Sequence, residues 1–187
     1  MRLVIGLTGP NAAGKGAAAA FLAARGFAVH SLSDVVREEA ARLGFPAERK
    51  HLIRIGNDLR ARGGPGVLAQ RILPRLGERD IVDSIRNPAE VTVLRTVPGF
   101  LLLGVDAAPE VRFARSLARA RPGDPATLEE FRARERQENA SSPEGQQLDA
   151  TFRLADRVLR NDADLESLER GVEQVVAAWE AALAARD

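Results

Sequence analysis

The stretch that decides the fold is Leu3-Val4-Ile5-Gly6-Leu7-Thr8-Gly9-Pro10-Asn11-Ala12-Ala13-Gly14-Lys15-Gly16. Its apolar, β-branched first half predicts a buried strand over residues 2–8 that ends at Gly9-Pro10. The alanine-rich run from Gly14 to Arg25 contains no proline and predicts a helix, with Gly26 as its C-cap. A glycine-rich loop therefore joins a strand to a helix.

This loop has the spacing G-x4-G-K. Glycines let backbone N–H groups fold around phosphate oxygens, the helix N-terminus adds a positive dipole, and the lysine reaches the terminal phosphates. The pattern thus predicts a nucleotide-binding P-loop made of Gly9, Asn11, Ala12, Ala13, Gly14, Lys15, Gly16 and Ala17. The alternative is a tight glycine turn with a solvated lysine. A Rossmann dinucleotide site is disfavoured, because the glycines do not form G-x-G-x-x-G.

One position departs from the usual pattern. The Ser or Thr that normally follows the lysine and holds Mg²⁺ is replaced by Gly16, and Ala17 comes next. Only two lysines, Lys15 and Lys50, occur among the 27 basic residues, so a lysine kept in this loop is the more notable.

The remainder of the chain alternates between strands and helices. Strands are expected over 27–32, 80–85, 99–105 and, weakly, 157–159. Helices are expected over 34–43 with Ser33 as N-cap, and over 47–62, 66–76, 109–119, 128–139 and 165–185, with a polar loop at 140–145. The continuous apolarity of 99–105 suits a parallel strand covered on both faces. The pattern predicts a single α/β domain whose ligands lie at the carboxyl ends of the strands.

Composition narrows the classes of function. The 187 residues carry 27 basic and 26 acidic side chains, which gives no support to a nucleic-acid binder, and one Trp with no Tyr leaves no stacking surface. The absence of cysteine excludes disulfides, thiolate zinc sites and cysteine nucleophiles, and fits a cytoplasmic protein. No apolar stretch reaches the roughly 20 residues of a membrane helix. We expect small-molecule partners and no membrane association; the oligomeric state is not predicted.

Several segments resemble the nucleoside monophosphate kinases of the adenylate kinase type. The Gly-Lys-Gly ending of the loop matches their P-loop, although Ala17 stands in place of their threonine. The segment from His30 to Arg37 is similar to their H-x-S-x-G-D-x-x-R, and Val82-Asp83-Ser84-Ile85-Arg86 to their V-x-D-G-F-P-R without the Phe-Pro step. The resemblance implies that Arg37 and Arg86 hold phosphate groups.

Two weaker matches follow. Residues 119–124 and 127–131 look like the short lid of this superfamily, which implies that Arg119 and Arg121 close over the transferring phosphoryl group. Residues 155–161 are similar to the ending of dephospho-CoA kinases, which places Asn161 near the adenine of ATP. Without these matches each arginine would be taken as solvated, as the helical spacing of Arg112 and Arg115 suggests.

The resemblance implies a P-loop NTPase three-layer sandwich with a five-stranded parallel sheet, a helical acceptor flap near 33–77 and a lid near 119–127. It implies transfer of the γ-phosphoryl of ATP to a nucleoside or deoxynucleoside monophosphate, with Mg²⁺ bridging the β- and γ-phosphates. Asp83 ends a strand, where a carboxylate favours a water-mediated Mg²⁺ role. Asp34 has three possible roles: a first-turn acid, a Mg²⁺ ligand, or a base toward an acceptor hydroxyl.

Two alternatives remain open. Dephospho-CoA kinase would use Asp34 as base, since a ribose hydroxyl must lose its proton. A slow ATPase acting as an assembly or regulatory factor would fit the missing P-loop hydroxyl. The acceptor base is not predicted, because Asn57, Asp58 and Gln70 in the flap fit several choices. His30 is expected to be a structural histidine with a satisfied hydrogen bond.

Overall fold

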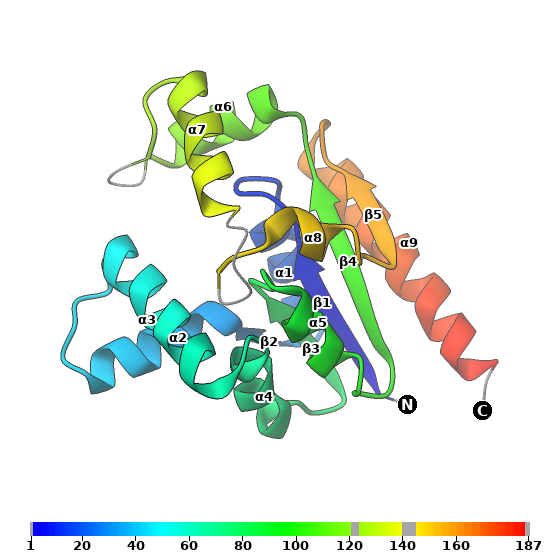
Figure 1. The fold of residues 1–187 in the computed structure, drawn as a ribbon. Helices are drawn as coiled ribbons and strands as arrows, with labels where there is room; N and C mark the ends of the chain where they lie inside the picture. The colour runs from blue at the N-terminus through cyan, green and yellow to red at the C-terminus, as the bar shows by residue number, and fades with distance from the viewer. Residues whose placement is uncertain (1, 121–123, 140–144, 186–187) are drawn as a thin grey trace.

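A computed structural model describes residues 2–120, 124–139 and 145–185. Five parallel strands form one sheet: β1 (Leu3–Thr8), β2 (Ala28–Ser31), β3 (Arg79–Asp83), β4 (Phe100–Asp106) and β5 (Arg157–Arg160). Their order is β2-β3-β1-β4-β5, with β1 in the centre (Figure 1). The predicted α/β fold with a five-stranded parallel sheet is confirmed. The chain crosses from one side of β1 to the other between β3 and β4, which is where such sheets bind ligands.

Helices cover both faces of the sheet, as the apolar strands require. On one face α1 (Lys15–Ala23) and α9 (Leu165–Ala184) pack together and bury Leu22 and Val172 against Ile5 and Leu103. The other face buries Val4, Val82 and Leu102 under the helices that follow β2 and β3. The result is the three-layer arrangement visible in Figure 1.

The segment expected to form an acceptor flap is helical. It contains α2 (Leu32–Arg42), α3 (Arg49–Gly63), α4 (Val67–Ile72) and a 3-10 turn (Leu73–Arg75). The helix predicted from residue 34 begins earlier, because the extended Ser31 is its N-cap and accepts a hydrogen bond from the N–H of Ser33. The helix predicted over 66–76 ends early, since Pro74 lies in the 3-10 turn that replaces its last part.

Two short helices were not predicted. Helix α5 (Pro88–Leu94) begins with a capping box formed by Asn87 and Glu90, and α8 (Leu148–Phe152) follows the predicted polar loop, of which residues 140–144 lie outside the description. Asn-Pro-x-Glu is a recognisable start signal, so α5 was available from the sequence. Helix α8 has only five residues, too few for a periodic pattern to show.

The remaining helices match their predictions closely. Helix α6 spans Pro109–Arg119, and α7 spans Leu128–Glu138 after a capping box between Thr127 and Glu130. The histidine prediction also agrees with the structure, because Nε2 of His30 lies 2.9 Å from Oδ1 of the buried Asp80. In the described part of the chain, no helix is long and apolar enough to cross a bilayer.

Candidate active site

The predicted P-loop joins β1 to α1 at the carboxyl edge of the sheet. Gly14 caps α1 with a φ of 112°, and Gly9 has a φ of 134°, both in the region that glycine tolerates best. Contacts allow no side chain at either position: a Cβ on Gly9 would lie 2.0 Å from the Val105 carbonyl oxygen, and one on Gly14 would lie 2.2 Å from the Asn161 amide nitrogen. The two glycines of the motif are therefore required by backbone shape and by space.

Lys15 folds back over this loop. Its Nζ donates hydrogen bonds of 2.8 Å to the carbonyl oxygens of Gly9 and Pro10. Burial of the ammonium, reinforced by the positive charge of Arg86, lowers the pKa of Lys15 from 10.5 to about 8, while Asp83 opposes the shift. Both bonds are to neutral carbonyl oxygens, so the ammonium keeps its positive charge available for the phosphates of a nucleotide.

Two side chains from distant parts of the sequence donate hydrogen bonds to backbone carbonyl groups of the loop. The buried Asn161 donates from Nδ2 to the Ala13 carbonyl oxygen at 2.8 Å. The buried Arg112 donates from Nε to the Ala107 carbonyl oxygen at 2.9 Å and reaches the Asn11 carbonyl oxygen at 3.4 Å. Asn161 was expected at the adenine, but its amide contacts the loop backbone, so adenine contact by Asn161 stays a prediction.

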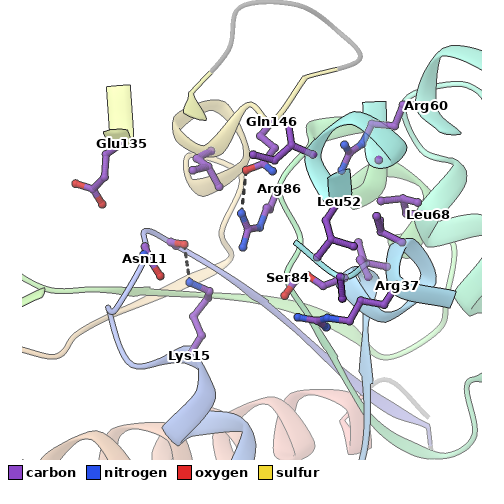
Figure 2. A pocket seen from close by; sticks show the side chains of 18 of the residues that line it. Asn11, Lys15, Arg37, Leu52, Arg60, Leu68, Ser84, Arg86, Glu135 and Gln146 are labelled. Atoms are coloured by element: carbon purple, nitrogen blue, oxygen red, sulfur yellow. Dashed lines mark hydrogen bonds between the residues drawn. The ribbon is translucent and has the colours of Figure 1, made fainter. Parts of the chain in front are cut away.

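A cavity of about 380 Å³ lies between the P-loop and the flap. Figure 2 shows Lys15 approaching it from α1, Arg86 from the loop after β3, and Arg37 and Arg60 from the flap helices. Among the residues predicted from sequence, the cavity is lined by Gly9, Asn11, Lys15, Arg37, Arg86 and Arg119. The fold thus gathers cations from four separate segments around one space.

Arg86 is a partly buried cation whose side chain bonds to a neutral partner. Its Nη1 donates to Oε1 of Gln146 at 2.9 Å, a neutral partner, as Figure 2 shows. Burial lowers the pKa of Arg86, and the charges of Asp83 and Glu90 oppose that change. An arginine pKa remains far above neutrality, so this guanidinium is a charged fork that suits an anionic ligand.

Arg37 and Asp34 bind each other. Nη1 of Arg37 donates to Oδ1 of Asp34 at 2.6 Å, and both side chains are more than half exposed. Arg37 lines the cavity, whereas Asp34 is not among the described residues that line it. The structure therefore brings the predicted phosphate-binding arginine to the site, while a catalytic role for Asp34 stays a prediction.

Arg119 is the last residue of α6 and the first residue of the predicted lid. It donates to both carboxylate oxygens of Asp124, at 3.1 and 3.3 Å, and to Oδ1 of Asn11 in the P-loop at 3.3 Å. These contacts place the Arg119 guanidinium at the P-loop edge of the cavity. Arg121 lies outside the described residues, so its part in a lid stays a prediction.

The metal prediction rests on Asp83 at the end of β3. Oδ1 of Asp83 is buried and has no hydrogen-bond partner within the described chain, while Oδ2 accepts a 3.3 Å hydrogen bond from Ser84. Within the same residues there is no group of three or more His, Cys, Asp or Glu side chains that could hold an ion. One available carboxylate oxygen fits Mg²⁺, which is usually held by one or two carboxylates together with substrate phosphates and waters.

Sequence reasoning missed a buried ion pair behind the cavity. Arg60, which lines the cavity, donates to Oε1 of Glu90 at 2.8 and 3.2 Å, and Oε2 of Glu90 accepts from the N–H groups of Arg86 and Asn87. Both side chains are almost fully buried. No motif marks this pair, because Arg60 lies in a helix with other arginines and thirty residues separate the partners.

Glu135 of α7 was also missed. It lines the cavity and binds Nη1 of Arg112, so α7 is tied to the side chain that supports the P-loop. The sequence shows only a charged helix there, in which one acidic residue cannot be told from the next.

No protein-family model matches the chain. A UPF0200 protein of Hyperthermus butylicus is 35% identical over 172 residues, covering 90% of each chain, and one of Pyrococcus horikoshii is 31% identical over 183 residues, covering 93% of this chain and 96% of the relative.

Solved structures show the same architecture. TT1252 from Thermus thermophilus is 29% identical with a TM-score of 0.61, covering 95% of this chain and 97% of its own. Shikimate kinase from Bacteroides thetaiotaomicron has a TM-score of 0.59 at 14% identity, covering 95% and 98% of the two chains, which is a likeness of fold. These likenesses confirm the predicted P-loop kinase fold.

Proposed function

We propose a function for this chain, which belongs to the UPF0200 protein family and has the P-loop kinase fold. It transfers the γ-phosphoryl group of ATP to the phosphate of a nucleoside or deoxynucleoside monophosphate. The observation that carries the proposal is the cavity of about 380 Å³ that Lys15 and Arg86 face from opposite sides. Lys15 faces the cavity from the P-loop, and Arg86 faces it from the side next to the flap. Donor and acceptor phosphates would therefore meet between two cations.

Phosphoryl transfer depends on positioned positive charge, because the moving group carries negative charge on three oxygens and needs little covalent assistance. Lys15 would leave the Gly9 and Pro10 carbonyls and bind the terminal phosphates of ATP. Arg86 and Arg37 would hold the acceptor phosphate, since guanidinium forks bind phosphate oxygens in pairs. Arg119, already hydrogen-bonded to the P-loop, would stabilise the charge that spreads over the moving group.

Mg²⁺ is the cofactor that this chemistry implies. Asp83 would hold it through its unpartnered Oδ1, by way of a water. When bound, the ion neutralises phosphate charge. Positions 16 and 17 offer no hydroxyl for direct coordination, so the phosphates and waters would provide the other ligands.

The carboxylates around the cavity favour a phosphate acceptor over a hydroxyl acceptor. A hydroxyl must lose a proton to a base, whereas a phosphate oxygen is already a nucleophile. The described acidic residues that line the cavity are Asp124 and Glu135, and both bind arginines. Asp34 is engaged by Arg37. This arrangement supports a monophosphate acceptor in preference to the ribose hydroxyl of dephospho-CoA.

A coupled ADP-release assay tests the proposal. The acceptors tested are the nucleoside monophosphates, the deoxynucleoside monophosphates and dephospho-CoA. Lys15→Ala is the inactive control. We expect turnover with a monophosphate that depends on Lys15. Turnover with dephospho-CoA alone, abolished by Asp34→Asn, would favour the hydroxyl kinase. ADP release that no acceptor accelerates would favour the slow ATPase.

A further inference from the structure

Resting on the proposed function, we infer that the acceptor site recognises its substrate through the phosphate and through apolar contact with the body of the molecule, so that it does not select among nucleobases. The inference concerns the flap side of the cavity, formed by α2, α3 and the start of α4.

Aliphatic side chains make up most of this wall. Those that line the cavity from the flap are Leu32, Val36, Ala47, Leu52, Ile53 and Leu68. Figure 2 shows Leu52 and Leu68 beside Arg37 and Arg60, next to the space that Arg86 enters. A planar base packed here would meet methyl groups, which contribute contact energy but no hydrogen bonds.

The polar residues that could read a base lie elsewhere. Asn57, Asp58 and Gln70 are the flap residues expected to do so, and none of the three is among the described residues lining the cavity. Asp58 faces Arg54 instead, with 3.9 Å between Oδ2 and Nε. The amide and carboxylate oxygens that would accept hydrogen bonds from base amino groups are therefore missing from the described flap wall.

The polar side chains that do line the flap side are those of two arginines and a serine. Glu90 neutralises Arg60, and Asp34 neutralises Arg37. The third polar residue of this side, Ser33, carries a small hydroxyl group. Across the cavity, Oε1 of Gln146 already accepts from Arg86. Arginines donate hydrogen bonds and cannot accept them, so they discriminate a phosphate from a neutral group far better than one base from another.

Ile53 gives the flap side of the cavity an exposed apolar side chain that a ligand could cover. It lines the cavity, yet 38% of its surface remains exposed. Leu43, the C-cap residue directly after α2, is similarly exposed at 46% but is not among the described cavity-lining residues. The two residues form a matched pair: one apolar side chain in the site and one outside it.

The expected selectivity follows from the kind of contact. Sites that hydrogen-bond a substrate group reject analogues lacking it by about 10⁴–10⁵-fold, whereas apolar pockets separate similar bodies by about 10–200-fold per methylene-sized change. With apolar contacts alone, we expect kcat/KM for the adenine, guanine, cytosine and uracil monophosphates to agree within roughly tenfold.

The experiment measures kcat/KM for these four monophosphates with the wild-type protein, Ile53→Ala and Leu43→Ala, and adds ribose 5-phosphate as an acceptor without a base. Ile53→Ala should raise KM for all four by a common factor of roughly three to ten, and Leu43→Ala should leave KM unchanged. Ribose 5-phosphate should bind at least about tenfold more weakly than any nucleotide, because it makes no contact with the aliphatic wall.

Different outcomes refute different claims. A preference of more than a hundredfold for one base, or an Ile53→Ala effect confined to one base, would overturn the inference and leave the proposed function intact. Failure of every monophosphate to accept a phosphoryl group, while ATP still binds in calorimetry, would refute the proposed function and the inference with it.

Discussion

Replacing Lys15 by methionine should stabilise the protein near neutral pH. The pKa of Lys15 falls from 10.5 to about 8 on folding, mainly through burial. The unfolded chain therefore binds the proton more tightly than the folded chain, so this lysine opposes folding whenever it is charged. At 1.36 kcal/mol per pKa unit the cost at pH 7 is about 3 kcal/mol. Methionine keeps the length of the side chain and removes this cost.

The hydrogen bonds that Lys15 makes reduce the gain. Its two bonds to the Gly9 and Pro10 carbonyls contribute on the order of 1 kcal/mol each, leaving about 1–2 kcal/mol in favour of Lys15→Met at pH 7. In a domain of this length the variant should melt roughly 2–8 °C higher. A stabilised but inactive variant would show that the site sacrifices stability for phosphate binding.

The pH dependence of the free energy of unfolding separates the effect of the lysine charge from the other effects of the substitution. Because the folded pKa is lowered, the wild-type protein gains stability as pH rises from 8 toward 10.5, and the variant does not. Urea unfolding at pH 7 and pH 9.5 should show the advantage of Lys15→Met shrinking by about 2 kcal/mol. A difference between the two proteins that stays constant over this range would refute the lowered pKa. Lys50→Met, at an exposed site, is the control.

Three further predictions concern other parts of the site. Arg119→Ala should lower kcat by roughly a hundredfold with little change in ATP affinity, because arginines of this kind act on the transition state; equal loss of affinity, measured by calorimetry, would argue against that role. Gly16→Ser restores a P-loop hydroxyl where an added Cβ meets nothing within 4 Å, and should reduce the Mg²⁺ concentration needed for half-maximal turnover; an unchanged Mg²⁺ titration would contradict it. Glu90→Leu leaves the guanidinium of Arg60 buried without its partner and should destabilise the fold by about 3–5 kcal/mol in urea unfolding, whereas Glu173→Leu on the exposed face of α9 should change little.

The sequence predicted the sheet and its central loop because these features have local causes. Strand β1, the glycine loop and α1 are adjacent in the chain, and their apolar runs and glycines determine conformation directly. The predicted start of α2 was wrong because Ser31 and Ser33 are equally good caps by residue type. Only the extended backbone of Ser31 distinguishes them.

The site was predicted less completely because it is built from residues far apart in the chain. Motifs predicted phosphate-binding roles for Lys15 and Arg86, and both side chains line the cavity. The pairing of Arg60 with Glu90, the support of the P-loop by Asn161, and the binding of Arg112 by Glu135 depend on tertiary packing that no local pattern records. The base-reading residues expected in the flap were chosen by residue type, which does not reveal which face of a helix lines a cavity.

Transfer of the phosphoryl group from ATP to a phosphate acceptor can be followed directly with an isotopic label. ATP labelled in its γ-phosphate is incubated with the protein, Mg²⁺ and a mixture of nucleoside monophosphates, with Lys15→Ala in parallel. We expect the wild-type protein, and not the variant, to form a nucleoside diphosphate that carries the label in its β-phosphate. Label recovered only as inorganic phosphate, or on a hydroxyl group of an acceptor, would contradict this expectation.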